Sequence, residues 1–319
     1  DNDFENGSGN LKNQDILNDY INMLCSKINI NKKLNVIVDS GNACGCLTVP
    51  QTLKKLNVNV NELYCNIDSS FPNHHPDPTV DSNLEDIISK IKNGEYDLGM
   101  AFDGDADRIV VIDEKGGIIR SDNLISLFLP EVITSKNKKI IYDVKCSEAL
   151  EKMIIKNGGV PIMWKTGHSF IKSKMKEISA PLAGEMSGHI FFADRYLGYD
   201  DGIYAALRVL ELIKDRYTLD NFLDSLPKTF STQEIKIECS DDKKFDIIKE
   251  LARTLDSEKI KVNKVDGLRV QKDDGWWLLR ASNTQAVLVA RVEAKSKNSL
   301  NNLQKELNLY LDKFNLSLS

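Results

Sequence analysis

The sequence lacks the features that mark membrane, nucleic-acid-binding and disulfide-rich proteins. No apolar run approaches the roughly 20 residues that a membrane-spanning helix needs. Positive charge is not in excess: 42 Lys and Arg stand against 47 Asp and Glu, and the net charge of −5 gives no attraction to nucleic acid or an anionic membrane. The six cysteines include no C-x-x-C pair, and a chain this long does not depend on a disulfide framework. Because the polar N-terminus is no signal peptide either, we expect a cytoplasmic protein without nucleic-acid or membrane partners.

The chain is long enough for two or three domains. Its 319 residues, 41% hydrophobic and 28% charged, are typical of a globular protein. Helical and strand patterns alternate in the first part, at 16–24, 36–38, 47–56, 82–92 and 97–102. This alternation predicts a parallel sheet covered by helices. The pair Gly116 and Gly117 predicts a hairpin turn that ends this first unit.

A second unit of similar size and order follows, and the pattern then changes. The second unit has helical patterns at 122–134, 147–157, 169–177 and 200–214, with strands at 139–142 and 160–164. Beyond residue 230, alternating strands predict an antiparallel sheet, at 234–239, 264–271, 275–280 and 286–294. Two helices, at 243–254 and 297–313, are expected on one face of it.

The predicted fold class is therefore α/β, with two successive related α/β domains that contain mixed sheets, followed by a smaller α+β C-terminal domain. We expect a polar linker over residues 1–12 before these domains. The first α/β domain is expected at 13–119, the second at 120–228 and the C-terminal domain at 229–319.

The segment AFDGDADRIVVID carries the strongest chemical signal in the chain. It places Asp103, Asp105 and Asp107 at alternate positions, with Arg108 directly after them, between two apolar runs. Like charges this close repel unless a cation collects them, and hard carboxylate oxygens suit Mg²⁺ or Mn²⁺. The pattern therefore predicts a metal site of the kind that serves phosphate chemistry.

Two other kinds of site share part of this pattern. An EF-hand loop needs Gly at its sixth position, where Arg108 stands, so Glu114 at the twelfth position is a coincidence. A haloacid-dehalogenase-like phosphatase also has Asp-x-Asp after an apolar strand, which would make Asp103 the nucleophile and Asp105 the acid/base. Its aspartate normally opens the domain, whereas about a hundred residues precede it here. The phosphatase remains the alternative.

A second motif, GEMSGH, places a carboxylate, a hydroxyl and an imidazole between two glycines. Glu185, Ser187 and His189 alternate and can point one way, which suits the binding of neighbouring sugar hydroxyls. An ordinary turn with a surface histidine is the other interpretation. We favour binding, because the small residues allow a ligand to approach the backbone closely.

A third motif, RASNTQA, places an arginine and short polar side chains at a turn between strands. Guanidinium, hydroxyl, amide and backbone N–H groups together suit an oxyanion such as phosphate. An ordinary polar turn would look the same, and local sequence does not separate the two. The candidate residues are Arg280, Ser282, Asn283 and Thr284.

Two further candidates follow predicted strands, and one conspicuous motif is expected to be structural. Lys145 and His168 each stand just beyond a strand, where α/β sheets bind ligands. His74 and His75 lie in FPNHHPDPTV, but adjacent side chains diverge in an extended chain and do not readily share a metal. The three prolines favour a rigid structural loop there.

Taken together, the motifs resemble the α-D-phosphohexomutase superfamily, and specifically its bacterial phosphomannomutase/phosphoglucomutase branch. Seven segments match in order across nearly the whole chain: VDSGNACG, FPNHHPDPTV, FDGDADR, DVKCS, KTGHSF, GEMSGH and RASNT. The resemblance implies four domains around a cleft, of which the first three are related α/β domains and the last is smaller.

The resemblance also implies roles for the candidate residues. Asp103, Asp105 and Asp107 are expected to bind Mg²⁺, with Mn²⁺ as a substitute and Arg108 beside them. GEMSGH is expected to recognise the sugar, and RASNT the phosphate that does not react. Lys145 and His168 are expected to line the cleft, with His168 helping proton transfer.

The implied reaction interconverts hexose 1-phosphates and 6-phosphates of mannose or glucose through a hexose 1,6-bisphosphate and an enzyme phosphoserine. The chain contains no Ser-His-Asn-Pro loop, which carries that serine in the family. We therefore expect this chain to lack the N-terminal phosphoserine domain, to need it in cis or in trans as a partner, and to be inactive alone. Apart from the Asp103 phosphatase, the alternative is a non-catalytic module that binds sugar phosphates.

Overall fold

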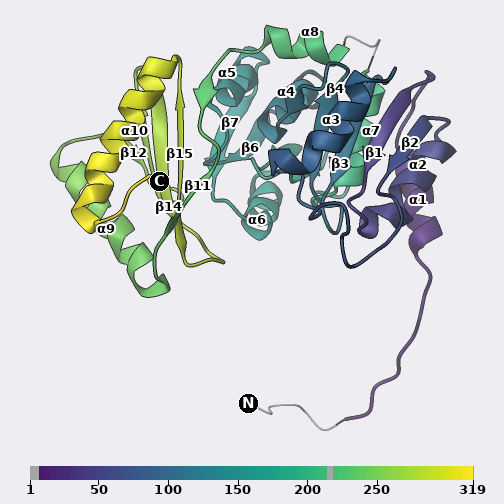
Figure 1. Ribbon diagram of the computed structural model, residues 1–319, viewed down its shortest axis with the longest axis horizontal. Helices are drawn as coiled ribbons and strands as arrows, with labels where there is room; N and C mark the ends of the chain where they lie inside the picture. The colour runs from purple at the N-terminus through teal and green to yellow at the C-terminus, as the bar shows by residue number, and fades with distance from the viewer. Residues whose placement is uncertain (1–6, 214–217, 319) are drawn as a thin grey trace.

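The computed structural model describes residues 7–213 and 218–318, which form three sheets with their helices (Figure 1). The predicted linker therefore lies partly outside the described residues, and its remainder up to the first helix is exposed coil. Two α/β units and a C-terminal unit with an antiparallel sheet follow in chain order, so the predicted fold class is confirmed. Among the described residues, no helix is both long and apolar enough to cross a membrane.

The first unit is a five-stranded mixed sheet with helices around it. Its helices are α1 (Leu17–Ser26), η1 (Cys44–Leu47), α2 (Val49–Lys55), η2 (Asp81–Leu84) and α3 (Glu85–Lys92). Its strands are β1 (Asn35–Asp39), β2 (Asn59–Leu63), β3 (Leu98–Phe102), β4 (Ile109–Asp113) and β5 (Ile118–Ile119).

The order of strands in the first sheet explains where its functional loop lies. The order is β2-β1-β3-β4-β5, with β1 parallel to β2 and β3, and with β3, β4 and β5 antiparallel in turn. The expected parallel pairing is thus limited to β2, β1 and β3, because the chain reverses direction first at the connection between β3 and β4 and again at the predicted hairpin turn at Gly116, between β4 and β5. The acidic segment 103–107 is the short connection between the fully buried strands β3 and β4.

The second unit repeats this arrangement with four strands in the order β7-β6-β8-β9. Strand β6 is parallel to β7 and β8, and β9 returns antiparallel to β8. The strands are β6 (Lys139–Asp143), β7 (Val160–Trp164), β8 (Leu182–Gly184) and β9 (Ile190–Phe192). The helices are α4 (Ser121–Val132), α5 (Glu148–Lys156), α6 (His168–Ile178), α7 (Gly202–Leu212) and α8 (Thr218–Ser225).

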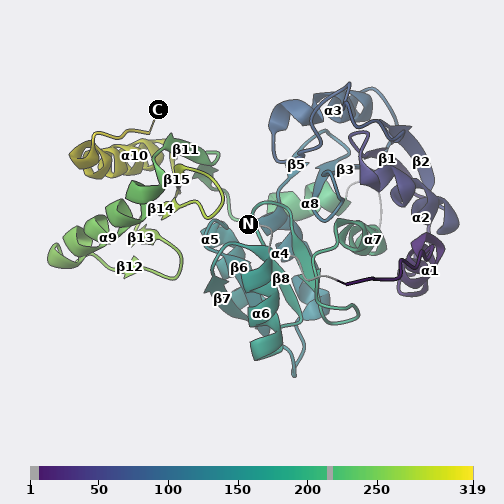
Figure 2. The same ribbon diagram turned by 90° about the horizontal axis from the view of Figure 1, so that it is seen from below.

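The first two units share one hydrophobic core. A continuous cluster of buried side chains runs from Leu24 in α1 to Leu219 in α8. Figure 2 shows α7 between the two sheets, and α7 packs on β4 of the first and β9 of the second. At the start of α7, a Cβ on Gly202 would lie 2.8 Å from the carbonyl oxygens of Ala106 and Arg108. Backbone therefore meets backbone where α7 touches the acidic connection.

The C-terminal unit is an antiparallel sheet with its own core. Its strands are β10 (Phe230–Ser231), β11 (Ile235–Glu238), β12 (Val262–Asn263), β13 (Leu268–Lys272), β14 (Gly275–Ala281) and β15 (Val287–Ala294). Helices α9 (Asp241–Ser257) and α10 (Lys297–Leu311), with η3 (Asp312–Phe314) after them, cover its outer face, as predicted (Figure 1).

Strand β14 is buried on both faces, which accounts for its unbroken apolar run. Trp277 and Leu279 face the helices of the C-terminal unit. Trp276 and Leu278 face the other way and pack with Val144 of the second unit.

The sequence patterns did not predict the short strands β10 and β12, the edge strand β2 or helix α8. The strand expected at 264–271 begins only at residue 268.

Candidate functional site

The three acidic residues of the connection between β3 and β4 come together. The ligand atoms of Asp103, Asp105 and Asp107 all lie within 4.8 Å of one another. Asp103 is buried, Asp105 exposed and Asp107 half-buried. Ala106 adopts a left-handed conformation (φ 63°), a strained choice that bends the connection. This cluster of hard oxygen donors fits Mg²⁺ or Mn²⁺.

Arg108 belongs to the same cluster. Its Nε donates to Asp103 Oδ2 at 2.5 Å, and its backbone N–H donates to Oδ1 at 3.0 Å. Its Nη1 also lies 3.7 Å from Asp77 of the proline-rich loop. Burial raises the pKa of Asp103 to about 6, although Arg108 opposes that rise. An ionised carboxylate has about four lone-pair sites, so Asp103 can accept from Arg108 and still hold a cation.

His189 joins the acidic connection to GEMSGH. Its Nε2 lies 3.3 Å from Asp107 Oδ1, and its Nδ1 lies 3.0 Å from Glu185 Oε2 and 3.0 Å from Ser187 Oγ. Burial alone would disfavour the charged ring, but the contacts with Asp107 and Glu185 outweigh it and raise the pKa of His189 to about 9. The three predicted sugar-recognition residues are therefore neighbours.

KTGHSF reaches the same place from the start of α6. Glu185 Oε1 accepts a hydrogen bond from the Gly167 N–H at 2.5 Å, which ties this loop to GEMSGH. The ring of His168 stacks on that of His189 with a centroid separation of 6.0 Å. His168 Nδ1 lies 3.0 Å from Asp200 Oδ2.

Lys145 lies where the second unit meets the C-terminal unit. Its Nζ donates to Glu234 at 2.9 Å and lies 4.0 Å from Asp143. Burial would lower the pKa of Lys145, but these two carboxylates outweigh burial and raise it. The ammonium is therefore charged and held between the two units.

The backbone around Lys145 is fastened by arginines of the C-terminal sheet. Arg269 Nη1 donates to the carbonyls of Val144 at 2.6 Å and Cys146 at 2.9 Å. Its guanidinium lies 3.7 Å over the ring of Trp276. Arg291 Nη1 donates to the Lys145 carbonyl. These contacts between the two units are made largely by side chains.

The RASNT loop faces the KTGHSF loop through one carboxylate. Arg280 Nε donates to Asp266 Oδ2 at 3.0 Å, and the same oxygen accepts from the Thr166 N–H at 3.0 Å. Arg280 is 5% exposed and Ser282 is 7% exposed, whereas Asn283 and Thr284 are exposed. The backbone N–H groups of Thr284 and Gln285 both point to Ser282 Oγ. The structure thus places this loop beside the end of β7.

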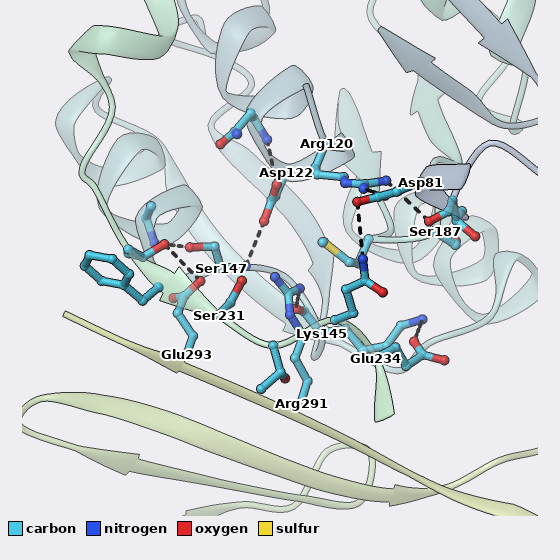
Figure 3. A pocket seen from close by; sticks show the side chains of 18 of the residues that line it. Asp81, Arg120, Asp122, Lys145, Ser147, Ser187, Ser231, Glu234, Arg291 and Glu293 are labelled. Atoms are coloured by element: carbon cyan, nitrogen blue, oxygen red, sulfur yellow. Dashed lines mark hydrogen bonds and ion pairs between the residues drawn. The ribbon is translucent and has the colours of Figure 1, made fainter. Parts of the chain in front are cut away.

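A cavity of about 870 Å³ adjoins these groups where all three units meet. Of the predicted site residues, Arg108, Lys145 and Ser187 line it. Figure 3 shows Lys145 and Ser187 with Glu234 and Arg291 around the cavity. The segment 226–234 that leads into the C-terminal unit forms another wall.

The proline-rich loop FPNHHPDPTV has a structural contact of its own. His74 Nε2 lies 3.0 Å from Asp39 Oδ2, and Nδ1 lies 2.9 Å from the His75 carbonyl. Both acceptors are best satisfied by a protonated ring, and the hydrogen bond to Asp39 raises the pKa of His74 although burial opposes it. A Cβ on Gly104 would lie 3.8 Å from Pro76, so the loop borders the acidic connection. Among the described residues, neither histidine belongs to a group of three or more potential metal ligands.

The His74 pair predicts a pH-dependent stability. Because the pKa of His74 is higher in the folded protein, its contribution is fully present below the unfolded value near 6.5 and is lost as the pH rises through the folded value. His74→Asn is expected to lower the free energy of unfolding by about 1–2 kcal/mol at pH 6 and by less at pH 9. Urea titrations at both pH values measure this, with the exposed neighbour in His75→Asn as the control. An equal loss at both pH values would contradict the pair's role.

Three carboxylates that hold predicted site residues were missed by sequence reasoning. Asp200 contacts His168, Glu234 contacts Lys145, and Asp266 contacts Arg280. Only Asp200 could have been noticed in the sequence, where two adjacent aspartates precede α7 although a helix needs only one N-cap residue. In the structure the cap is Asp201, which accepts from the Tyr204 N–H at 2.8 Å, so Asp200 is left for another role. The other two partners lie 89 and 14 residues from the groups they hold, in unremarkable sequence.

Three family profiles match the chain in order. They are the phosphoglucomutase/phosphomannomutase alpha/beta/alpha domain II over residues 18–117, domain III over 120–230 and the C-terminal domain over 234–309. The phosphomannomutase/phosphoglucomutase of Pseudomonas putida is 43% identical over 305 residues, which are 95% of this chain and 66% of that protein. A phosphoglucomutase of Neisseria meningitidis is 40% identical over 95% of this chain and 67% of its own.

Solved structures agree with these matches. A phosphoglucomutase/phosphomannomutase family protein from Burkholderia thailandensis superposes with a TM-score of 0.89 and 39% identity, over 97% of this chain and 67% of that one. An N-acetylphosphoglucosamine mutase of Aspergillus fumigatus, solved with GlcNAc-6P and magnesium, shares the fold at 15% identity, with a TM-score of 0.64 over 92% of this chain and 68% of that one. The chain spans about two thirds of the length of these relatives. This chain belongs to the phosphoglucomutase/phosphomannomutase family, of which it contains domains II, III and the C-terminal domain.

Proposed function

We propose that this chain supplies the metal, sugar and phosphate sites of a phosphomannomutase/phosphoglucomutase, which interconverts hexose 1-phosphates and 6-phosphates through a bisphosphate. The observation that supports it most is the continuous chain of contacts from Asp107 through His189 and Glu185 to Gly167, next to His168. It joins a metal-type cluster to polar side chains suited to a sugar. We also propose that the functional units follow the boundaries 13–119, 120–228 and 229–319.

Asp103, Asp105 and Asp107 would hold the Mg²⁺, for which Mn²⁺ can substitute. Their grouped oxygens fit a hard divalent cation, which when bound neutralises charge on a transferring phosphoryl group. Arg108 holds Asp103 in place and leaves part of its own guanidinium on the cavity side.

The other predicted residues would bind different parts of the substrate. Glu185, Ser187 and His189 offer acceptors and donors to sugar hydroxyls, and His168 offers a ring nitrogen for proton transfer. Arg280 with Ser282, Asn283 and Thr284 would hold the phosphate that does not react, while Lys145 adds positive charge nearby. The protein thus contributes mainly positioning and charge stabilisation.

We further propose that these 319 residues do not catalyse the mutase reaction on their own. They contain no Ser-His-Asn-Pro loop to carry the transferred phosphoryl group. Activity is expected only when a phosphoserine-bearing domain is supplied, in the same polypeptide or as a separate partner, with a hexose 1,6-bisphosphate as activator. Robust mutase activity of the purified chain with no such domain would contradict this.

Two alternatives make different predictions. A non-catalytic module would bind mannose 6-phosphate or glucose 6-phosphate but remain inactive after the phosphoserine domain is added. A phosphatase that uses Asp103 as nucleophile would release phosphate from a sugar phosphate without any bisphosphate, and Asp103→Asn would abolish that release. Coupled mutase and phosphate-release assays on the same preparation separate the three functions.

Replacement of Arg280 tests the phosphate site. Arg280→Met is expected to weaken binding of mannose 6-phosphate by about 10- to 100-fold, because a charge-assisted contact is lost and Asp266 is left to repel the phosphate. Isothermal titration calorimetry of the chain measures this. Arg253→Met, which removes an exposed arginine of α9, is the matched control. An affinity within threefold of the unchanged protein would argue against RASNT as the phosphate loop.

A further inference from the structure

Asp200 stands at the junction of the candidate site without an assigned role. Its carboxylate Oδ2 lies 3.0 Å from His168 Nδ1, and its Oδ1 accepts from Lys172 Nζ at 2.8 Å. The side chain is only 5% exposed, whereas that of His168 is 53% exposed. Carboxylate oxygens of Asp200 and Asp107 and a ring nitrogen of His189 lie within 4.8 Å of one another. Asp200 is therefore a nearly buried carboxylate directly behind a half-exposed histidine.

The backbone holds Asp200 in this place from both sides. An antiparallel bridge pairs it with Phe191 of β9. The next residue, Asp201, caps α7 through the Tyr204 N–H and also accepts from the hydroxyls of Tyr20 and Tyr196. Since Asp201 meets the needs of the helix end, the carboxylate of Asp200 is free to serve the site.

The contacts decide which ring nitrogen of His168 carries the proton. Lys172 Nζ also lies 3.2 Å from His168 Nδ1, and donation from that ammonium would require a bare Nδ1. A bare Nδ1 would then set its lone pair against a carboxylate oxygen at 3.0 Å, which is repulsive. Lys172 loses nothing by turning to Asp200, at 2.8 Å. Nδ1–H therefore donates to Asp200, and the lone pair of the neutral ring is on Nε2.

We propose that Asp200 is a positioning residue, which fixes the tautomer and orientation of His168 so that Nε2 is presented to the substrate as a proton acceptor. Within the described residues, Nε2 has no hydrogen-bond partner, as a nitrogen kept for substrate requires. This arrangement is the general one in which a buried carboxylate orients a histidine for proton transfer. The proposal rests on the proposed function for its substrate, but not for the tautomer itself.

The same cluster does not suit a second metal ion. A ligating histidine must offer a lone pair, but both nitrogens of His189 face carboxylate oxygens, Nε2 at 3.3 Å from Asp107 and Nδ1 at 3.0 Å from Glu185. Lys172 also forms an ion pair with Asp200, and its positive charge disfavours a metal cation there. A structural ion pair between Asp200 and Lys172, with His168 as a bystander, is the interpretation that the experiment must exclude.

Nitrogen NMR of the chain tests the proposal without reference to catalysis. The whole sequence contains four histidines, so the imidazole spectrum is simple, and His168→Gln assigns the signal by its loss. His168 is expected as the Nδ1–H tautomer in the unchanged protein and in Lys172→Met. In Asp200→Asn it should shift toward Nε2–H, while the signal of His74, which lies in another loop and contacts Asp39, stays in place and shows an intact fold. Asp200→Glu should recover part of the Nδ1–H form.

An Nε2–H tautomer in the unchanged protein, or an unaltered tautomer in Asp200→Asn, would overturn the proposal. In a preparation that carries the phosphoserine domain, Asp200→Asn is expected to lower kcat about 10- to 100-fold with KM changed less than about threefold. A shifted tautomer with unchanged kcat would overturn the positioning role alone. If no mutase activity exists at all, the proposed function fails while the tautomer result still stands.

Discussion

Asp105→Asn is expected to lower the affinity of the chain for Mn²⁺ about 100-fold. Asp105 is the exposed member of the cluster, whereas Asp103 is bound by Arg108 and Asp107 by His189. It is therefore the carboxylate most free to turn toward a cation. Because the three like charges lie close together, the metal-free variant should be at least as stable as the unchanged protein.

Calorimetric titration with Mn²⁺ measures the affinity, and thermal melts with and without metal measure the stability. Asp246→Asn removes an exposed carboxylate of α9 with the same change in net charge, so it controls for bulk electrostatics. The metal assignment would be wrong if Asp105→Asn and Asp246→Asn bound Mn²⁺ equally well.

The second large effect is expected at Arg269. This arginine is 3% exposed, holds the carbonyls of Val144 and Cys146 and lies over Trp276. Arg269→Met removes these donors and leaves buried oxygens unpaired, at a cost of about 3–4 kcal/mol. The C-terminal unit has its own core, so its melting should separate from that of the rest.

In Arg269→Met, differential scanning calorimetry should show a separate transition of the C-terminal unit at a lower temperature. The melting temperature of the rest of the protein should be unchanged. Hydrogen exchange at 143–147 should rise with it, because that backbone is what Arg269 holds. The control is Arg253→Met, on an exposed face of the same unit. Loss of stability spread evenly over the whole chain would show that Arg269 does not act at this boundary.

Local patterns predicted much of the fold because its central elements have strong periodicity. The buried run of β3, the glycine hairpin and helices α4 to α7 of the second unit follow from residues near in sequence. Strand β2 was missed because its side chains are largely exposed and it pairs only with β1, at the edge of the sheet. Helix α8 was missed because a single buried leucine marks it in polar sequence.

The site was predictable as a set of loops but not as a set of contacts. The motifs named His189 and Asp107, but nothing in their spacing of 82 positions indicates that the two side chains meet. The same holds for Lys145 and Glu234, which are joined only when the C-terminal sheet packs against Val144. The sequence identifies the site residues through their local motifs. Their contact partners depend on how three separate sheets pack, which local motifs do not determine.

The glycine at the start of α7 sets a difference between the two boundaries of this protein. Where α7 meets the acidic connection, main chain lies on main chain, and Gly202 leaves no space for any other residue. No side-chain substitution can adjust the contact at that point, because it is made by main chain alone. The boundary with the C-terminal unit is made of long side chains such as Arg269 and Arg291, each replaceable one at a time. An engineer who wishes to adjust the contact between units in small steps would therefore choose the second boundary rather than the start of α7.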